Sequence, residues 1–414
     1  MTSTSIDDLD LTNAELYRGG FPHEIFTRLR AEAPVWWQQT PVALRDEAAD
    51  DGFWVLSRHA DVQAANRDPE LFTAFEGPSL VNRPEMHGAM LVSMDGRDHT
   101  RQRKLISAGF TPRMVGRLEE QMRRWSAKII DAALARGDCD FVPDAAYLLP
   151  MHMIADIVGI PESDRAWLFG ITNDFLAAGD PSRGLTRDEQ MVIQAQMFEY
   201  ARKLGEDKRR NPQDDVWTIL STVEIDGDDG AKTRLGEVEL DLFFLLLTVA
   251  GSETTRNAIT LGLHALLGDP EQMALLRREP QAIPVAVEEM IRWSSPVSYF
   301  ARRATRDTEI RGVKIAAGER ITLWYPSANR DADVFRDPFR FDARRTPNEH
   351  VAFGGGGPHF CLGANLARRE MITFFEELFR RTSTIEQTGP LAFAPLGIFN
   401  SILVAPQSLP VRLA

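Results

Sequence analysis

Cysteine and long apolar runs are both scarce in this chain of 414 residues. Two cysteines, Cys139 and Cys361, do not provide the disulfide framework of a small secreted domain. The most apolar run, 242–251, is about half of the ~20 residues that a membrane-spanning helix needs. The first ten residues are acidic and polar, and they lack the basic start and apolar core of a signal peptide. We therefore expect a cytoplasmic protein without a membrane span.

An excess of positive charge is also missing, since the formal net charge is −13 at pH 7. Nucleic-acid binding needs clustered basic residues, so this balance argues against DNA or RNA as a partner. Low-complexity linkers and repeats of fixed period are absent as well. Because 43% of the residues are hydrophobic, the chain can bury a large core, and we expect residues 1–414 to form a single domain.

What the chain does contain is helical periodicity over most of its length. The predicted helices cover residues 24–32, 114–135, 163–176, 187–208 and 235–267. Apolar runs at 34–37 and 52–56 predict a small antiparallel sheet near the N-terminus. Two short strands, 310–315 and 320–325, flank a turn and predict a second small sheet. We expect a mainly α protein with small β-sheets, a final helix after Cys361 and an extended tail.

A glycine-rich loop leads one of the two thiols into a helix-forming stretch. Four glycines, 354–357, precede Cys361, and residues 362–369 favour a helix. Backbone N–H groups at a helix N-terminus stabilise a thiolate, which is the form that binds a metal. The glycines allow the backbone to pass close to a large flat ligand. Cys139 has acidic neighbours that oppose a thiolate, so we expect Cys361 to be the functional thiol.

Polar residues interrupt the apolar helix predicted at 235–267. Glu253 and Thr254 follow Ala250 and Gly251 in the middle of this helix, where burial of polar groups is costly. A threonine there can donate to a carbonyl three or four residues earlier, and the helix can loosen into a groove beside Gly251. The alternative is a helix that turns its polar face outward at Ser252.

Two pairs of polar residues stand at helical spacing elsewhere in the chain. Glu289 and Arg292 are three residues apart and share one helix face. His99 and Arg103 are four apart. Taken alone, such pairs are more often solvated surface pairs of little energetic value.

Taken together and in this order, the motifs resemble those of the cytochrome P-450 superfamily, the haem-thiolate monooxygenases. The cysteine loop departs in one respect, because Phe353 stands eight residues before Cys361 and the family's usual spacing is one shorter. This longer loop is similar to that of bacterial members that oxidise sterol side chains and branched lipids. The resemblance covers essentially the whole chain. It implies the triangular P-450 fold, with haem buried between a long central helix and the helix of the cysteine loop.

The resemblance also implies a role for each motif. Cys361 would be the axial thiolate ligand of haem b, in a loop that also contains Phe353 and Gly363. Thr254 and Glu253 would relay protons for the cleavage of O2, flanked by Ala250 and Gly251. Two further groups are implied: a buried structural triad of Glu289, Arg292 and Arg340, and a set of propionate-binding residues, His99, Arg103, Arg302 and His359. Arg303 could serve in place of Arg302.

Candidate substrate contacts are mainly apolar and come from several segments: Leu80, Met86, Met90, Leu91, Phe175, Leu246, Val297 and Phe399. By base rate each of them is more often ordinary core packing. As a set they suggest a fairly large apolar pocket. We expect hydroxylation of a hydrophobic aliphatic substrate, such as a sterol side chain, a branched lipid or a terpenoid.

Electrons would reach the haem from NAD(P)H only indirectly, through a separate ferredoxin and ferredoxin reductase. A basic patch on the cysteine side would attract an acidic ferredoxin. Its expected members are Arg101, Lys104, Arg368 and Arg369. We expect a monomer.

Other interpretations of the cysteine loop fit less well. A phosphate-binding loop would need a Lys-Ser/Thr pair after the glycines, and a zinc site would need further Cys or His ligands. The alternative function is a haem-thiolate ligand-binding or sensing protein without turnover. Such a protein has no need of Glu253 and Thr254, and a peroxide-driven enzyme commonly lacks them too. A helical scaffold without haem would leave the cysteine loop unexplained.

Overall fold

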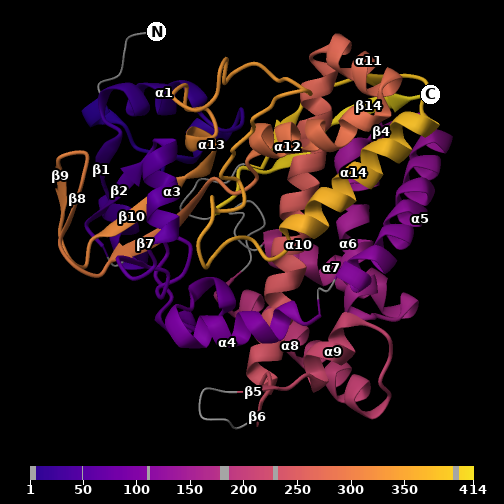
Figure 1. Cartoon of the computed structure of the whole chain (residues 1–414), viewed down its shortest axis with the longest axis horizontal. Helices are drawn as coiled ribbons and strands as arrows, with labels where there is room; N and C mark the ends of the chain where they lie inside the picture. Colours follow the sequence, from indigo (N-terminus) through magenta and orange to yellow (C-terminus); the bar gives the residue numbers. More distant parts are fainter. Residues whose placement is uncertain (1–5, 49, 110–111, 178–185, 227–231, 395–400) are drawn as a thin grey trace.

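A long helix, α10 (Glu237–Leu267), runs through the middle of the helical part of the molecule (Figure 1). The computed structural model describes residues 6–48, 50–109, 112–177, 186–226, 232–394 and 401–414. Within these ranges α10 is buried along most of its length, as expected of a helix that is apolar nearly all round. Its first turn carries Glu237 and Glu239, and Glu239 accepts a hydrogen bond from the Gly236 N–H at 2.8 Å.

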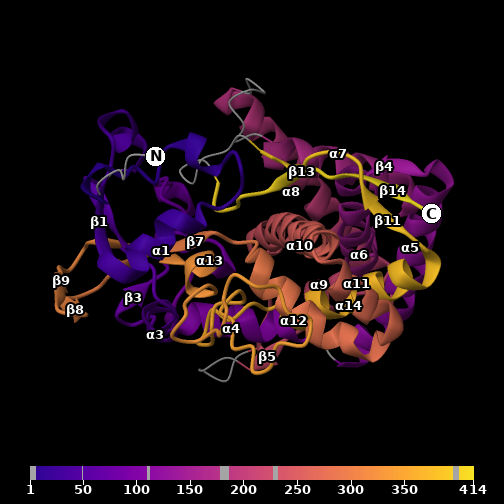
Figure 2. The same cartoon turned by 90° about the horizontal axis from the view of Figure 1, so that it is seen from above.

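Several helices, among them α6, α8, α12 and α14, pack around α10. Seen from above, α7 and α8 lie on one side of α10 while α12 and α14 lie on the other (Figure 2). The remaining helices are α1 (His23–Glu32), α2 (Arg45–Ala48), α3 (His59–Arg67), α4 (Gly96–Ser107), α5 (Pro112–Arg136), α6 (Leu148–Val158), α7 (Glu162–Ala177), α8 (Arg187–Arg210), α9 (Val216–Thr222), α11 (Pro270–Arg278), α12 (Ile283–Ser294), α13 (Tyr325–Ala328) and α14 (Ala364–Arg381). None of the described helices is long and apolar enough to cross a membrane.

The predicted helices match the observed ones to within a few residues at each end. The expected helix at 114–135 is α5, 163–176 is α7, 187–208 is α8 and 235–267 is α10. Local signals account for this agreement. In α8, for example, Thr186 caps the helix by accepting from the Glu189 N–H, and the Glu189 carboxylate accepts from the Thr186 N–H at 2.7 Å.

The strands form one larger sheet and several small ones. The larger sheet has the order β1-β2-β10-β7-β3 and lies at the opposite end of the molecule from α5 and α14 (Figure 1). The strands are β1 (Val35–Gln39), β2 (Gly52–Leu56), β3 (Phe72–Thr73), β4 (Asp138–Asp140), β5 (Ile225–Asp226), β6 (Lys232–Thr233), β7 (Tyr299–Ala304), β8 (Thr308–Ile310), β9 (Val313–Ile315), β10 (Arg320–Trp324), β11 (Ile385–Gln387), β12 (Ala392–Phe393), β13 (Pro406–Ser408) and β14 (Pro410–Leu413).

The predicted N-terminal sheet is confirmed, since β1 and β2 pair in antiparallel fashion. The second predicted sheet is wrong. The expected strand 310–315 is instead part of a hairpin over 308–315, because Arg311 and Gly312 both have positive φ (51° and 81°) and reverse the chain between β8 and β9. β10 instead joins the larger sheet, where it lies between β2 and β7. Pairing between strands far apart in the sequence decided this arrangement.

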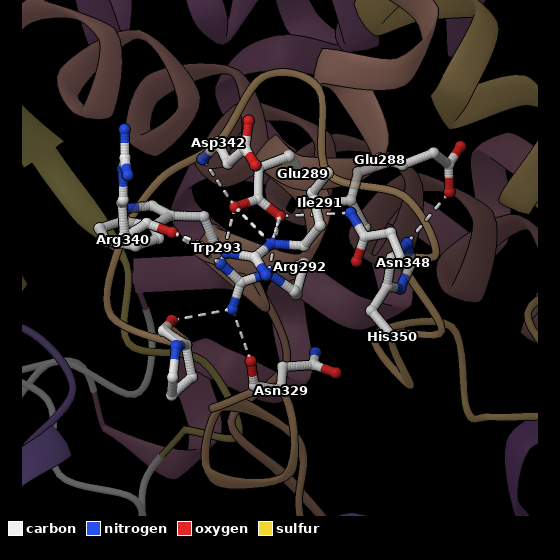
Figure 3. A network of polar contacts seen from close by, with 12 residues as sticks. Glu288, Glu289, Ile291, Arg292, Trp293, Asn329, Arg340, Asp342, Asn348 and His350 are labelled. Atoms are coloured by element: carbon white, nitrogen blue, oxygen red, sulfur yellow. Dashed lines mark hydrogen bonds and ion pairs between the residues drawn. The ribbon is translucent and has the colours of Figure 1, made fainter. Parts of the chain in front are cut away.

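A buried ion network ties α12 to the segment before the cysteine loop (Figure 3). Glu289 and Arg292 have fully buried side chains, and Nε and Nη2 of Arg292 each donate to a Glu289 oxygen at 2.7 Å. The Glu289 carboxylate also accepts from the Asp342 N–H at 3.0 Å and from Asn348 Nδ2 at 3.2 Å. The predicted pair is therefore a structural centre and not a surface pair.

The third cation of this network is Arg345, and the prediction of Arg340 is wrong. Arg345 is buried, and its Nε lies 3.1 and 3.0 Å from the two oxygens of Glu289. Arg340 is exposed, and its side chain extends away from Glu289 in Figure 3. The chain turns here, so Arg340 faces the network with its backbone, and its carbonyl accepts from Arg345 Nη2 at 3.0 Å.

The network continues to the loop that carries Cys361. Arg292 Nη1 donates to the Asn329 carbonyl at 2.7 Å, and the Asn329 side chain accepts from the Val351 N–H at 2.8 Å. The neighbouring Glu288 accepts from Arg368 Nε in α14 at 2.6 Å and lies 3.0 Å from His350 Nε2. Burial acts to raise the pKa of Glu288, but the bonds to His350 and Arg368 bring it down to about 2. Helix α12 is thus joined to both ends of the cysteine loop.

Replacing Glu289 by alanine should lower the free energy of unfolding by about 3–5 kcal/mol, because two buried guanidinium groups lose their counter-charge. Urea unfolding of the purified variant measures this loss. Arg340→Ala is the matched control and should change the free energy by less than about 0.5 kcal/mol. An equal loss in both variants would contradict the assignment of Arg345 as the partner.

Candidate functional site

A cavity lies between α10, α4 and the loop that enters α14. Its wall is mainly apolar. The cavity has a volume of about 270 Å³, measured as the space open to the centres of water-sized molecules. The wall also includes most of the chemically distinctive residues singled out from the sequence. These are His99, Arg103, Ala250, Gly251, Thr254, Arg302, Phe353, His359, Cys361 and Gly363.

Cys361 reaches the cavity immediately before α14 begins at Ala364. Its backbone N–H donates to the Phe353 carbonyl at 3.0 Å, which closes the loop. Burial raises the pKa of the Cys361 thiol, and hydrogen bonds from the Gly363 and Ala364 N–H groups only partly oppose this effect. Arg103 and Arg368 also lower the pKa of the thiol, and a metal cation at the sulfur would favour the thiolate further.

Two of the four glycines before Cys361, Gly356 and Gly357, pack closely against α3. All four have positive φ, between 65° and 105°. A Cβ atom on Gly357 would lie 2.4 Å from the Asn66 carbonyl oxygen, and one on Gly356 would lie 2.9 Å from Arg67 Nε. The close approach that the glycines permit is thus, in the first place, an approach to another helix.

Four basic side chains from separate segments meet at the cavity. His99 and Arg103 come from α4, Arg302 from β7 and His359 from the cysteine loop. The two imidazole rings lie 4.5 Å apart, and His359 Nε2 is 2.9 Å from Asp95 Oδ1. Burial lowers the pKa of His99 to about 4, and its buried Nε2 atom has no hydrogen-bond partner.

Neither cavity arginine has an acidic partner among the described residues. Arg302, which is 4% exposed, donates to the Ala301 carbonyl at 2.8 Å, and Arg103 Nη2 donates to the Phe360 carbonyl at 2.6 Å. Burial lowers the pKa of both groups. The adjacent Arg303 instead forms ion pairs with Asp50 and Glu76. Arg302 is therefore the arginine available to a ligand.

These observations fit a flat anionic group that carries a metal. Buried cations without counter-charges are costly, so the two arginines and the unpartnered His99 Nε2 favour an anionic ligand. The thiol supplies one strong metal ligand on the same cavity. In the described part of the chain, no three His, Cys, Asp or Glu side chains gather to hold a bare metal ion. Haem, with its carboxylates and its single protein-supplied thiolate, matches this donor set.

The α10 wall places Thr254 on the cavity together with Ala250 and Gly251. As predicted, Thr254 Oγ1 donates back to the Ala250 carbonyl, at 2.7 Å. The expected loosening of the helix is wrong, because α10 continues without a break from Glu237 to Leu267. Gly251 instead allows close packing with α6, since a Cβ atom there would lie 3.2 Å from Ile154 Cδ1.

Glu253 does not line the cavity. Its side chain is buried and forms a close ion pair with Arg256, through Oε1, while Oε2 has no hydrogen-bond partner. Burial raises the pKa of Glu253, and Arg256 only partly opposes the shift. The structure thus separates the acid from the hydroxyl with which the sequence associated it.

The predicted substrate contacts divide into two groups. Leu91, Leu246 and Val297 line the cavity. Leu80 is 2% exposed and packs in the N-terminal hydrophobic cluster, so its prediction is wrong. Met86, Met90 and Phe175 are also not among the lining residues. Phe399 lies outside the described residues.

Several lining residues were missed, although a signal for some of them existed. Phe243, Leu247 and Ala258 stand at helical spacing from Thr254 and share its face of α10. Phe300 and Ile154 had no such signal, because only the folded chain brings β7 and α6 to the cavity.

The predicted basic patch is largely neutralised. Arg101 pairs with Glu239, Arg368 with Glu288 and Arg369 with Glu119. Arg368 also lies over the Phe353 ring, 4.6 Å from its centre. Lys104 is exposed. The patch therefore carries less free positive charge than its sequence suggests.

The model of one protein family, cytochrome P-450, matches residues 181–392. A methyl-branched lipid omega-hydroxylase of Mycobacterium tuberculosis is 41% identical over 93% of this chain and 90% of its own length. A steroid C26-monooxygenase of Rhodococcus jostii is 36% identical, over 96% of this chain and 83% of its own. Among solved structures, a Mycobacterium marinum cytochrome P-450 in complex with pseudoionone has a TM-score of 0.89 and 36% identity, and the match covers 100% of both chains.

One lining residue, Glu370 in α14, had no sequence signal at all. It is 4% exposed, and its Oε2 atom is buried without a hydrogen-bond partner. Burial raises the pKa of Glu370 from 4.5 to about 8. This acid is therefore neutral in the folded protein at pH 7.

Glu370→Gln should stabilise the protein increasingly as the pH rises. Between pH 4.5 and about pH 8 the unfolded chain gives up the Glu370 proton while the folded chain keeps it, so the wild type loses stability as the pH increases. The glutamine variant has no such cost, which reaches about 5 kcal/mol above pH 8. Thermal unfolding of both proteins at several pH values measures the difference in Tm. A difference that stays constant from pH 5 to pH 9 would contradict the raised pKa.

Proposed function

Because the chain belongs to the cytochrome P-450 family, we propose that Cys361 is the thiolate ligand of a haem iron bound in the cavity. The protein is a cytochrome P-450 monooxygenase. When bound, the haem activates O2 with two externally supplied electrons, so that one oxygen atom enters a substrate C–H bond and the other leaves as water. The observation that carries the site assignment is the meeting of a thiol and two unpaired arginines on one cavity.

Arg103, Arg302 and His99 would bind the haem propionates. Both arginines are partly or fully buried and lack acidic partners in the described chain, and His99 Nε2 is free to donate or accept. His359 is oriented by Asp95, whose carboxylate also accepts from the Ala74 N–H at 2.8 Å and from Thr73 Oγ1 at 2.5 Å. Haem b, which carries two propionates, suits this set.

Thr254 and Glu253 would deliver the protons that reduction of O2 consumes. The Thr254 hydroxyl lies on the cavity wall, and Ala250 orients it by accepting its hydrogen bond. Glu253 directly precedes Thr254 in the chain, and its side chain is buried and excluded from bulk water. A binding or sensing protein would not need proton donors, so Glu253 and Thr254 favour a monooxygenase over that alternative. No contact of the described residues in the cavity supports the alternative.

The substrate would be a hydrophobic aliphatic molecule. Leu91, Leu246 and Val297, together with Phe243 and Phe300, give the cavity a hydrocarbon wall without a charged anchor on the α10 side. The relatives named above act on methyl-branched lipids and steroids, and one solved relative binds the terpenoid pseudoionone. We therefore propose a branched lipid, a sterol side chain or a terpenoid.

Electrons would come from NAD(P)H through a ferredoxin reductase and a ferredoxin, with the chain acting as a monomer in the cytoplasm. Lys104 on α4 is exposed, and Arg368 belongs to the helix that follows the cysteine loop, so a ferredoxin would bind on this side of the molecule. The ion pairs of Arg101, Arg368 and Arg369 leave Lys104 as the contributor to steering among the four predicted residues.

Replacing Cys361 by serine should abolish the red-shifted carbon-monoxide band that a haem thiolate gives, because the serine hydroxyl cannot replace the anionic sulfur ligand. The absorption spectrum of the reduced, carbon-monoxide-treated protein measures the effect. Cys139→Ser is the control and should keep the band. Persistence of the band in Cys361→Ser would overturn the ligand assignment.

A spectral titration distinguishes the three substrate classes. A methyl-branched fatty acid, a steroid with an intact side chain and pseudoionone are each added to the ferric protein. A fitting compound should displace water from the iron and shift the spectrum from low to high spin. Val297→Phe should weaken binding of the fitting compound at least about tenfold, because the larger side chain fills part of the apolar cavity. A short-chain sugar serves as the negative control, and a response to it alone would argue against an apolar substrate.

A further inference from the structure

A half-buried ion pair lies beside the aromatic ring of the cysteine loop. Arg368 begins the second turn of α14, and its guanidinium carbon lies 4.6 Å from the centre of the Phe353 ring. Phe353 lines the cavity together with Cys361, and its carbonyl accepts a hydrogen bond from the Cys361 N–H at 3.0 Å. Arg368 itself does not line the cavity. Its charge therefore acts on the cavity past the Phe353 ring and not by direct contact with a ligand.

Glu288 fixes the position of this guanidinium. Nε of Arg368 donates to Glu288 Oε1 at 2.6 Å, and Nη2 donates to Oε2 at 3.1 Å. Two parallel bonds of this kind hold a guanidinium in one orientation. His350 Nε2 lies 3.0 Å from the same Oε2 atom and adds a further contact to the carboxylate (Figure 3). The Arg368 and Glu288 side chains are 28% and 31% exposed, so water screens the pair only in part.

The two charges of the pair are not equivalent for Cys361. Arg368 stands on the helix that the cysteine loop enters, and long side chains of a helix lean toward its N-terminus, here toward Cys361. Glu288 approaches the guanidinium from α12. An ion pair is neutral at long range, but close to one of its members the nearer charge dominates. Arg368 accordingly favours the thiolate form of Cys361.

A fixed positive charge near a metal-bound thiolate affects the metal. It stabilises electron density on the sulfur, so that the sulfur donates less to the iron. It also favours the addition of an electron, because reduction makes the site more negative. Arg103, the other arginine that favours the thiolate, lines the cavity itself, where a carboxylate of the bound haem would neutralise it. Arg368 keeps its position and its partner when the cavity is filled.

We propose that Arg368, held in place by Glu288, is a positioning residue that makes the haem iron easier to reduce by acting through Cys361. The inference rests on the proposed role of Cys361 as the haem ligand. The ferric iron gains one electron and becomes ferrous, and no other bond or proton takes part. Glu288 limits the effect, because its negative charge opposes that of Arg368. The competing explanation is a purely structural clasp between α12 and α14.

The experiment is an anaerobic titration of the ferric holoenzyme with dithionite in the presence of redox mediators. Arg368→Gln leaves the Glu288 charge uncompensated and should lower the equilibrium constant for reduction at least about threefold. Glu288→Gln leaves the Arg368 charge uncompensated and should raise that constant at least about threefold. Arg368→Lys keeps the charge but loses the two parallel bonds, so it should lie closer to the wild type than Arg368→Gln does.

Two further variants serve as controls. The double variant with glutamine at both positions has lost both charges, and its equilibrium constant should lie within about twofold of the wild-type value. Arg369→Gln removes the neighbouring charge on α14, which pairs with Glu119 and is 46% exposed. This variant should also stay within about twofold of the wild type, because water screens an exposed charge.

A structural clasp predicts a different pattern. Each single variant breaks the same contact, so both would shift the equilibrium constant in the same direction, and the double variant would be no closer to the wild type. That pattern, or the absence of any shift, would overturn the inference. If the wild-type protein lacked the red-shifted carbon-monoxide band, the proposed function would fail and the inference with it. If the band is present but the two single variants do not shift in opposite directions, only the inference fails.

Discussion

The position of Cys361 depends on one buried ion network, the contact of Glu289 with Arg292 and Arg345. Two guanidinium groups share one carboxylate in an interior that excludes water, so each charge needs the others in place. Arg292 and Arg345 also donate to backbone carbonyls of the turns between 329 and 340. The network thus holds an irregular segment that has few regular hydrogen bonds of its own. Asn329 connects this segment to Val351, which lies just before the cysteine loop.

The arginines on the cavity differ from several other arginines of the protein in lacking an acidic partner. Arg292, Arg303 and Arg368 all have acidic partners, whereas Arg103 and Arg302 on the cavity have none in the described chain. A buried, unpaired cation is tolerated where a ligand supplies the anion. Glu370 shows the opposite solution, because an acid without a cationic partner remains neutral. The cavity therefore combines unpaired cations for an anionic cofactor with a neutral wall for an apolar substrate.

Helix α10 contributes to two environments at once. Its residues Ala250, Gly251 and Thr254 face the cavity, while Glu253 and Arg256 form an ion pair at its side. An unbroken helix can do this because its side chains radiate in all directions at fixed angles. The acid and the hydroxyl are therefore adjacent in sequence, but only the hydroxyl faces the cavity.

Sequence patterns by themselves determined the features that depend on neighbouring residues: the long helices, the β1–β2 pair, the placement of Cys361 before α14 and the back-bonded hydroxyl of Thr254. Only the tertiary structure decided the features that depend on distant residues. It joined β10 to β2, chose Arg345 instead of Arg340 as the partner of Glu289, buried Leu80 in another cluster and brought Glu370 to the cavity. Helical periodicity and capping act over a few residues, whereas burial and charge pairing are settled by which segments the folded chain brings together.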